Sequence, residues 1–280
     1  SGGGTFSGTW SSIVPALPAD ANPTVPAAAL ELPACGPSLC VAFGTYQSTD
    51  GTFPGMIDVF SGGQWSSIEQ PEPDDFAGIG GAGPGGLSSA SCTSGPVCAA
   101  VGNYLNTNDQ DVALIDTLSG GTWSAISAPM PADADVADPD YAASLSSLSC
   151  MPNSSCLAVG GYEGLSGRLE GVSETLSGGV WTPTTAPLPT DAAASYGGGL
   201  ESVKCMSTGS CVAVGTYVNG TAEHEGFIDT LSGGVWTAMS APLPADAAFD
   251  PQAEFADLDC NPTMCAVVGQ YTSVSGGNDA

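Results

Sequence analysis

The chain has 280 residues and a formal net charge of −27, because it contains 29 acidic residues and only two basic ones, Arg168 and Lys204. Nucleic acids and anionic membrane surfaces are excluded as partners, since both are bound through clusters of lysine and arginine. No apolar run approaches the roughly 18 residues of a membrane-spanning helix, so we expect no membrane insertion. The charge reflects missing cations rather than added acids, which fits a secreted protein in acidic or protease-rich surroundings.

One sequence unit recurs five times along the chain. Each unit holds a close pair of cysteines, a tyrosine six residues after the second cysteine, and a tryptophan after a turn of the Leu-Ser-Gly-Gly type. A repeat of this kind predicts a single domain over residues 1–280. The repeats cover approximately residues 19–73, 74–131, 132–189 and 190–244, and a last repeat at 245–280 is completed by residues 1–18.

Each repeat is predicted to form four short antiparallel strands. In the fourth repeat they are residues 200–205, 211–217, 226–231 and 235–240, and the second of them is apolar on both faces. A strand of that kind is typical of burial between two sheets. Four strands per repeat without a helix pattern predict an all-β fold, a five-bladed β-propeller.

The spacing of aromatic residues predicts that the ring closes on itself. Tyrosine precedes tryptophan by 19 residues in the first four repeats, as Tyr217 precedes Trp236. Joining the two ends of the chain places Tyr271 at that same distance from Trp10. We therefore expect N- and C-terminal segments to share one blade, with residues 5–18 supplying the outer strand of the sheet begun by residues 255–271.

Ten cysteines form five close pairs, one pair per repeat, and predict five local disulfides. Zinc is the alternative, but it needs four converging ligands, and His224 is the only histidine. Disulfides indicate an oxidising, extracellular compartment. The predicted pairs are Cys35–Cys40, Cys92–Cys98, Cys150–Cys156, Cys205–Cys211 and Cys260–Cys265.

An aspartate recurs after the proline-rich segment that leaves each fourth strand. Two interpretations are open: a ring of ligand-binding carboxylates, or aspartates that cap turns by bonding to their own backbone. Tyr141 and Tyr196 lie in the variable links between repeats and are candidates for surface contact. The tentative ligand-binding set is therefore Asp20, Asp133, Asp191, Asp246, Tyr141 and Tyr196, with Asp74 or Asp75 at the equivalent place in the second repeat.

Calcium is the one ion for which the sequence offers a candidate site. Asp133, Asp135, Asp138 and Asp140 are close in the third repeat, although no Asp-x-Asp-x-Asp run supplies the six or more oxygens of a calcium site. No other cofactor and no catalytic residue is predicted. Asn153 and Asn219 begin glycosylation sequons.

A second acidic series lies in the third strands, at Asp58, Asp116, Glu174 and Asp229. These residues alternate with apolar ones, so we expect them to face away from the neighbouring core or to accept hydrogen bonds from backbone N–H groups of the next sheet.

The repeat resembles those of secreted actinobacterial proteins of unknown role. The resemblance is carried by units such as Ser-Val-Lys-Cys-Met-Ser-Thr-Gly-Ser-Cys-Val-Ala-Val-Gly-Thr-Tyr, residues 202–217, followed by Leu-Ser-Gly-Gly-Val-Trp at 231–236. In blade count alone the chain is also similar to lectin propellers of the tachylectin-2 type. The likeness concerns fold, which does not determine function.

The leading functional prediction is a secreted, non-catalytic recognition protein, in which loops on one face bind glycans or a cell-surface polymer multivalently. The first alternative is a structural subunit of an extracellular filament, sheath or surface layer, whose partners are copies of itself. The second is a glycoside hydrolase or lyase with a carboxylate pair in a central pocket. Close similarity between repeats favours several equivalent sites over a unique catalytic one.

Overall fold

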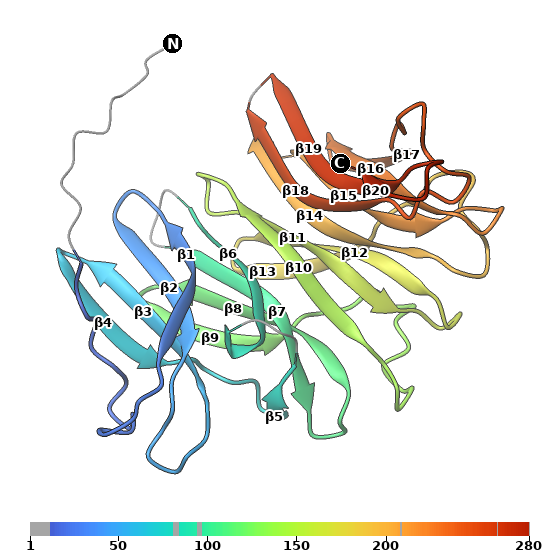
Figure 1. Cartoon of the computed structure of the whole chain (residues 1–280). Helices are drawn as coiled ribbons and strands as arrows, with labels where there is room; N and C mark the ends of the chain where they lie inside the picture. Colours follow the sequence, from blue (N-terminus) through green and yellow to red (C-terminus); the bar gives the residue numbers. More distant parts are fainter. Residues whose placement is uncertain (1–11, 81–83, 94–96, 208, 262, 280) are drawn as a thin grey trace.

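The computed structural model describes residues 12–80, 84–93, 97–207, 209–261 and 263–279. The described residues form antiparallel sheets and one short 3-10 turn (η1, Pro84–Gly86), with no α-helix among them. The predicted all-β class is therefore confirmed. The sheets follow one another along the chain and stand in a row, from the blue sheet that contains β1 to the red sheet that contains β18 (Figure 1).

The order of strands in space follows their order in the chain, except that β5 and β6 both pair with β7. The first sheet contains β1 (Ala29–Cys35), β2 (Leu39–Thr45), β3 (Gly55–Ser61) and β4 (Gln64–Glu69). The second contains β5 (Phe76–Ile79), β6 (Leu87–Cys92), β7 (Cys98–Asn106), β8 (Asp111–Ser119) and β9 (Thr122–Ser127), and the third contains β10 (Ala143–Cys150), β11 (Cys156–Glu163), β12 (Leu169–Ser177) and β13 (Val180–Thr185). The fourth contains β14 (Gly198–Ser207), β15 (Ser210–Val218), β16 (His224–Ser232) and β17 (Val235–Ser240), and the last contains β18 (Glu254–Asn261), β19 (Met264–Thr272) and β20 (Asn278–Asp279).

The Ser-Gly-Gly turns join the third and fourth strands by two-residue hairpins. Both glycines of each turn have positive φ, for example 59° at Gly178 and 85° at Gly179. A two-residue turn of this kind matches the right-handed twist of its strands, and glycine adopts it without a steric penalty. The turn therefore fixes the register that places Trp181 opposite Leu176.

All five predicted disulfides are present, and no described cysteine is free. They join β1 to β2, β6 to β7, β10 to β11, β14 to β15 and β18 to β19 across paired positions, with 4.0 Å between the two Cα atoms. The zinc alternative is wrong, because every described thiol is used in a disulfide.

Successive sheets pack face to face through apolar side chains. Ala99 and Val101 of the second sheet join Tyr162, Val172 and Trp181 of the third in one buried cluster. Burying such side chains is the main favourable term in folding. The recurring tyrosine and tryptophan are therefore mostly core residues here.

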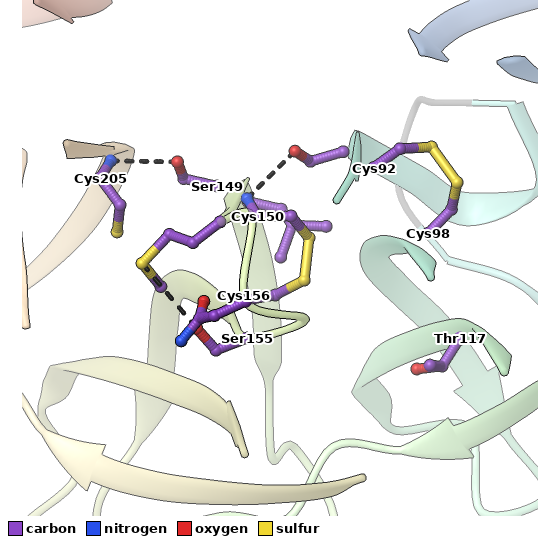
Figure 2. The surroundings of a disulfide bond; sticks show 12 residues. Cys92, Cys98, Thr117, Ser149, Cys150, Ser155, Cys156 and Cys205 are labelled. Atoms are coloured by element: carbon purple, nitrogen blue, oxygen red, sulfur yellow. Dashed lines mark hydrogen bonds between the residues drawn. A yellow bond between two sulfur atoms is a disulfide. The ribbon is translucent and has the colours of Figure 1, made fainter. Parts of the chain in front are cut away.

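Serine hydroxyls also connect neighbouring sheets through their inner strands. Ser147 and Ser149 of β10 accept hydrogen bonds from the backbone N–H groups of Val203 and Cys205 in β14, at 3.1 and 3.0 Å. Figure 2 shows Ser149 directed at the nitrogen of Cys205, beside the Cys150–Cys156 disulfide. The same arrangement joins β6 to β10 through Ser89 and Ser91.

The two ends of the row are unlike its middle. Within the described residues, the last sheet packs on β14, β15 and β16 but makes no extensive contact with β1–β4. Residues 12–18 form no strand, and residues 12–16 line a surface hollow with Phe60 and Trp65 of the first sheet. The rest of the segment predicted to close the ring, residues 5–11, lies outside the described residues.

Candidate functional site

The recurring aspartates are bound by the recurring tyrosines. In every repeat the tyrosine at the end of the second strand donates its hydroxyl hydrogen to Oδ1 of the aspartate in the link that precedes the sheet. The O–O distances are 2.7 Å for Tyr46–Asp20, 2.7 Å for Tyr104–Asp75, 2.9 Å for Tyr162–Asp133, 3.1 Å for Tyr217–Asp191 and 2.9 Å for Tyr271–Asp246.

The backbone of each of these aspartates is held as well. The carbonyl oxygen of Asp133 accepts the N–H of Leu165, and that of Asp191 accepts the N–H of Gly220, both at 2.7 Å. These donors lie in the hairpins between the second and third strands, so the link and the hairpin form one face of the molecule. The prediction of turn capping, one of the two open interpretations, did not include the tyrosine hydroxyl as the partner of the carboxylate.

Two carboxyl groups share one tyrosine hydroxyl in the fourth repeat. The hydroxyl of Tyr217 lies 3.1 Å from Oδ1 of Asp191 and 2.8 Å from Oε2 of Glu225. Asn219 donates its amide to Oε1 of Glu225 at 2.8 Å. Asp191 is exposed and Glu225 is half-buried, so both residues are at least partly open to solvent.

The third repeat has a similar pair next to the only arginine of the sequence. The hydroxyl of Tyr162 lies 2.9 Å from Asp133 and 3.4 Å from Oε2 of Glu170. Arg168 forms a 3.0 Å ion pair with Glu170 and donates to the carbonyl oxygen of Ala194, in the next link. This arginine therefore neutralises one carboxylate of the pair, which leaves the fourth repeat as the uncompensated pair.

The tyrosines act as hydrogen-bond donors rather than nucleophiles. Burial is the main cause that raises the pKa of Tyr104 to about 12, and the bond to Asp75 adds to it. Burial also raises the pKa values of Tyr162 and Tyr217, and Tyr217 is only 2% exposed. A phenol that resists ionisation keeps its proton for the neighbouring carboxylate.

The aspartates proposed for calcium do not converge. Among the residues that the structure describes, no three carboxylate, histidine or cysteine side chains form a group suited to a metal ion. Asp133 is bound to Tyr162, and the backbone N–H of Asp140 donates to Oδ1 of Asp138 at 2.8 Å. The last of these bonds is a local turn contact.

Of the two tyrosines predicted for surface contact, only one is at the surface. Tyr196 is 57% exposed, but Tyr141 is 3% exposed and belongs to the cluster between the second and third sheets. The prediction for Tyr141 is wrong, because the link folds inward there and buries the ring.

The third-strand acids lie inside the molecule. Asp58, Asp116, Glu174 and Asp229 each have 0% exposure. Both carboxyl oxygens of Glu174 and of Asp229 lack a hydrogen-bond partner. The prediction that these groups bond to backbone N–H groups is therefore wrong for both residues, because the neighbouring strands use their N–H groups in the sheet ladders.

No protein-family model and no curated protein matches the chain. Solved structures with a similar fold include a Trypanosoma rangeli sialidase in complex with sialic acid, at 11% identity and a TM-score of 0.45, over 88% of this chain and 44% of the sialidase. A mutant of AofleA from Arthrobotrys oligospora is 16% identical, with a TM-score of 0.43, over 91% of this chain and 67% of AofleA. A xylan β-1,4-xylosidase from Bacillus halodurans C-125 is 11% identical, with a TM-score of 0.37, over 92% of this chain and 55% of the xylosidase.

These neighbours have β-propeller-like folds, and that coarse part of the predicted architecture stands. They contradict the leading functional prediction, a non-catalytic protein that binds glycans or a cell-surface polymer, because the sialidase and the xylosidase are named as carbohydrate-cleaving enzymes. The chain spans less than half of the sialidase. Such identities concern the fold alone, so the function below is argued from the side chains of this chain.

Proposed function

We propose that the chain is a glycoside-cleaving enzyme whose acid–base pair is Asp191 and Glu225. The observation that carries this proposal is their shared contact with Tyr217, at 3.1 and 2.8 Å. Because both oxygens contact one hydroxyl, they lie at most about 6 Å apart, which allows the separation of about 5–5.5 Å between the carboxyl groups of retaining glycosidases and excludes the longer one of inverting enzymes.

The surroundings of the two carboxyl groups suggest their roles. Glu225 is oriented by Tyr217 and Asn219, so it is the group placed to attack the anomeric carbon as a carboxylate. Asp191, exposed on the link, would carry a proton on Oδ2, since Oδ1 accepts from Tyr217, and would donate that proton to the departing glycosidic oxygen. It would then take a proton from the water that displaces Glu225 from the glycosyl intermediate.

The charge of the chain narrows the substrate class to neutral polysaccharides. A net charge of −27 repels polyanions such as uronic-acid polymers. The only arginine, Arg168, is already paired with Glu170, so no free guanidinium is offered to a substrate carboxylate.

The release of reducing ends from a panel of neutral polysaccharides tests this function. Glu225→Gln and Asp191→Asn should each lower the rate by about a hundredfold or more. The first removes the carboxylate that attacks the sugar, and the second removes the group that transfers the proton. Asp75→Asn is the matched control, because Asp75 also binds a tyrosine but residue 112, which corresponds to Glu225, is a valine. Failure of the unaltered protein to cleave any polymer, or full activity in both variants, would overturn the proposal.

The same proposal extends to the architecture and location of the chain. Residues 1–280 would form one domain of five blades, although residues 12–16 lie against the first sheet and not in the last blade. The apolar, exposed side of β19, where Val268 is 60% exposed, supports a missing neighbour. Five disulfides support secretion or attachment to the cell surface. No helix in the described residues is long and apolar enough to cross a membrane.

The open side of the last sheet also supports a second candidate function, a structural subunit. Met264 and Val268 of β19 are 65% and 60% exposed, and they are suited to pack against the first sheet of another copy. A head-to-tail contact of this kind produces open filaments when the rotation does not close. Light scattering separates the two: a monomer of 27.6 kDa supports ring closure, whereas ordered polymers support the subunit.

A further inference from the structure

We infer that Glu174 and Asp229 are uncharged in the folded protein and that their ionisation opens the contact between sheets above neutral pH. The sheets would then act as a pH-sensitive device that favours acidic surroundings. The inference is independent of the proposed catalytic pair, which lies at the exposed link rather than inside the sheet packing.

The first observation is the position of the two side chains within their sheets. Glu174 in β12 is paired with Ala158 and Pro183 on its two sides. Asp229 in β16 is paired with Ala213 and Ala238 in the same way. Because alternate residues of a strand share a face, Glu174 lies on the side of Val172 and Leu176, which pack against the second sheet.

The second observation is the lack of any compensating donor. Neither oxygen of Glu174 or Asp229 has a hydrogen-bond partner, and both residues are fully buried. An ionised carboxylate in such a place is strongly disfavoured, so the group takes up a proton instead. Burial is the single cause that raises the pKa of Glu174 to about 8 and that of Asp229 to about 7.

Among the residues that the structure describes, no charged group contributes to the electrostatics of these two carboxyl groups. Their pKa values respond to burial alone, without a contribution from any acid, base or hydrogen bond. Asp116 differs, because Gln70 donates its amide to Oδ2 at 2.8 Å, although burial still raises the pKa of Asp116 well above its usual range.

The later repeats have an alanine where the first repeat has Gln70. The backbone N–H of Gln70 donates to the carbonyl oxygen of Gly55 in the first sheet, and the N–H groups of Ala128 and Ala186 donate in the same way to the second and third sheets. Alanine at these places supplies no amide to a carboxyl group on the next sheet. The first repeat therefore partly compensates its neighbour's carboxyl group, and the later repeats do not.

The direction of the pH effect follows from these raised pKa values. A carboxyl group that is neutral when folded contributes its full stability below its unfolded pKa of about 4, and that contribution is lost as the pH rises through the folded pKa. Each group then raises the unfolding equilibrium constant by up to about tenfold per pH unit within that window. Stability should therefore decline between pH 5 and pH 8, where many proteins are most stable.

Surface repulsion acts in the same direction but has another signature. The 29 acidic residues repel one another once ionised, and salt screens the exposed ones. Buried groups are screened much less. Measurements at high salt therefore isolate the contribution of the buried carboxyl groups, which are Glu174 and Asp229 together with Asp58 and Asp116.

The test is a set of thermal unfolding curves at high salt from pH 4 to pH 9, in which near-ultraviolet circular dichroism records the loss of tertiary packing. The unaltered chain should lose melting temperature steadily above pH 5. The double variant Glu174→Gln/Asp229→Asn should lose clearly less over that range, because neither amide ionises, and the slope that remains comes from the buried Asp58 and Asp116. The control Asp109→Asn/Asp140→Asn removes the same charge from exposed positions and should follow the unaltered chain.

Parallel curves for the unaltered chain and the Glu174→Gln/Asp229→Asn variant would overturn the inference. A second measurement covers the case in which the double variant does not fold. The infrared carbonyl band of protonated carboxyl groups should be present in the unaltered protein at pH 6.5 and should weaken in Glu174→Gln alone. Absence of that band at pH 6.5 would equally overturn it.

Discussion

Two sets of carboxyl groups repeat along this chain, and they differ in everything except their periodicity. The link aspartates, such as Asp133, are mostly exposed and each accept a hydrogen bond from a tyrosine that is buried in the first four repeats. The strand acids are fully buried, and Glu174 and Asp229 among them have no hydrogen-bond partner. The first set stabilises a connection by charge-assisted hydrogen bonds, and the second places an ionisable group where charge is costly. Repetition in sequence therefore does not reveal a residue's role; its solvation does.

The strongest way to break this contrast is to place a permanent charge at a strand position. Glu174→Lys should cost about 3–5 kcal/mol of unfolding free energy, because an uncompensated charge would then be buried between two sheets. Ser177→Lys, at the exposed end of the same strand β12, is the matched control and should change little. Urea unfolding at pH 7 measures both. Equal stabilities would mean that water reaches Glu174 and that the contrast is false.

Sequence patterns were sufficient for the elements that depend on local chemistry. The five cysteine pairs predicted the five disulfides, and Ser-Gly-Gly at residues 177–179 predicted the tight turn between β12 and β13. Both features need only residues that are close in the chain. The tendency of Cys211–Tyr217 to be apolar on both faces likewise indicated a strand between sheets.

The candidate site was harder to predict because its partners are distant in sequence. Tyr162 binds an aspartate 29 residues earlier, and Tyr217 binds one 26 residues earlier. A glutamate eight residues after each of these tyrosines was the signal that a second carboxyl group would join them. The burial of Glu174 was not readable, since alternation alone gives two faces and, in a strand between two sheets, both are covered.

Removing one link contact would sharpen the comparison from the other side. Tyr162→Phe should cost about 1–3 kcal/mol, because the hydroxyl that binds Asp133 and lies 3.0 Å from Thr185 is lost. Tyr271→Phe removes the equivalent hydroxyl in the last sheet, where Tyr271 and Asp246 are more exposed, and should cost less. Thermal unfolding of both variants decides the point: if the two costs are equal, burial does not strengthen the link contacts.

The smallest expected effect concerns the neutral contacts that join sheets. Ser149→Ala should cost about 1 kcal/mol, because the N–H of Cys205 would lose its acceptor at 3.0 Å. The cost should be independent of pH, since neither a hydroxyl nor a backbone amide ionises in the accessible range. Chemical unfolding at pH 5 and pH 8 would show this, with Ser154→Ala, exposed in the nearby hairpin, as the control. A cost that grew with pH would show that loosening around Glu174 had reached the inner strands, which would join the serine contacts and the buried carboxyl groups into one cooperative interface between the third sheet and its neighbours.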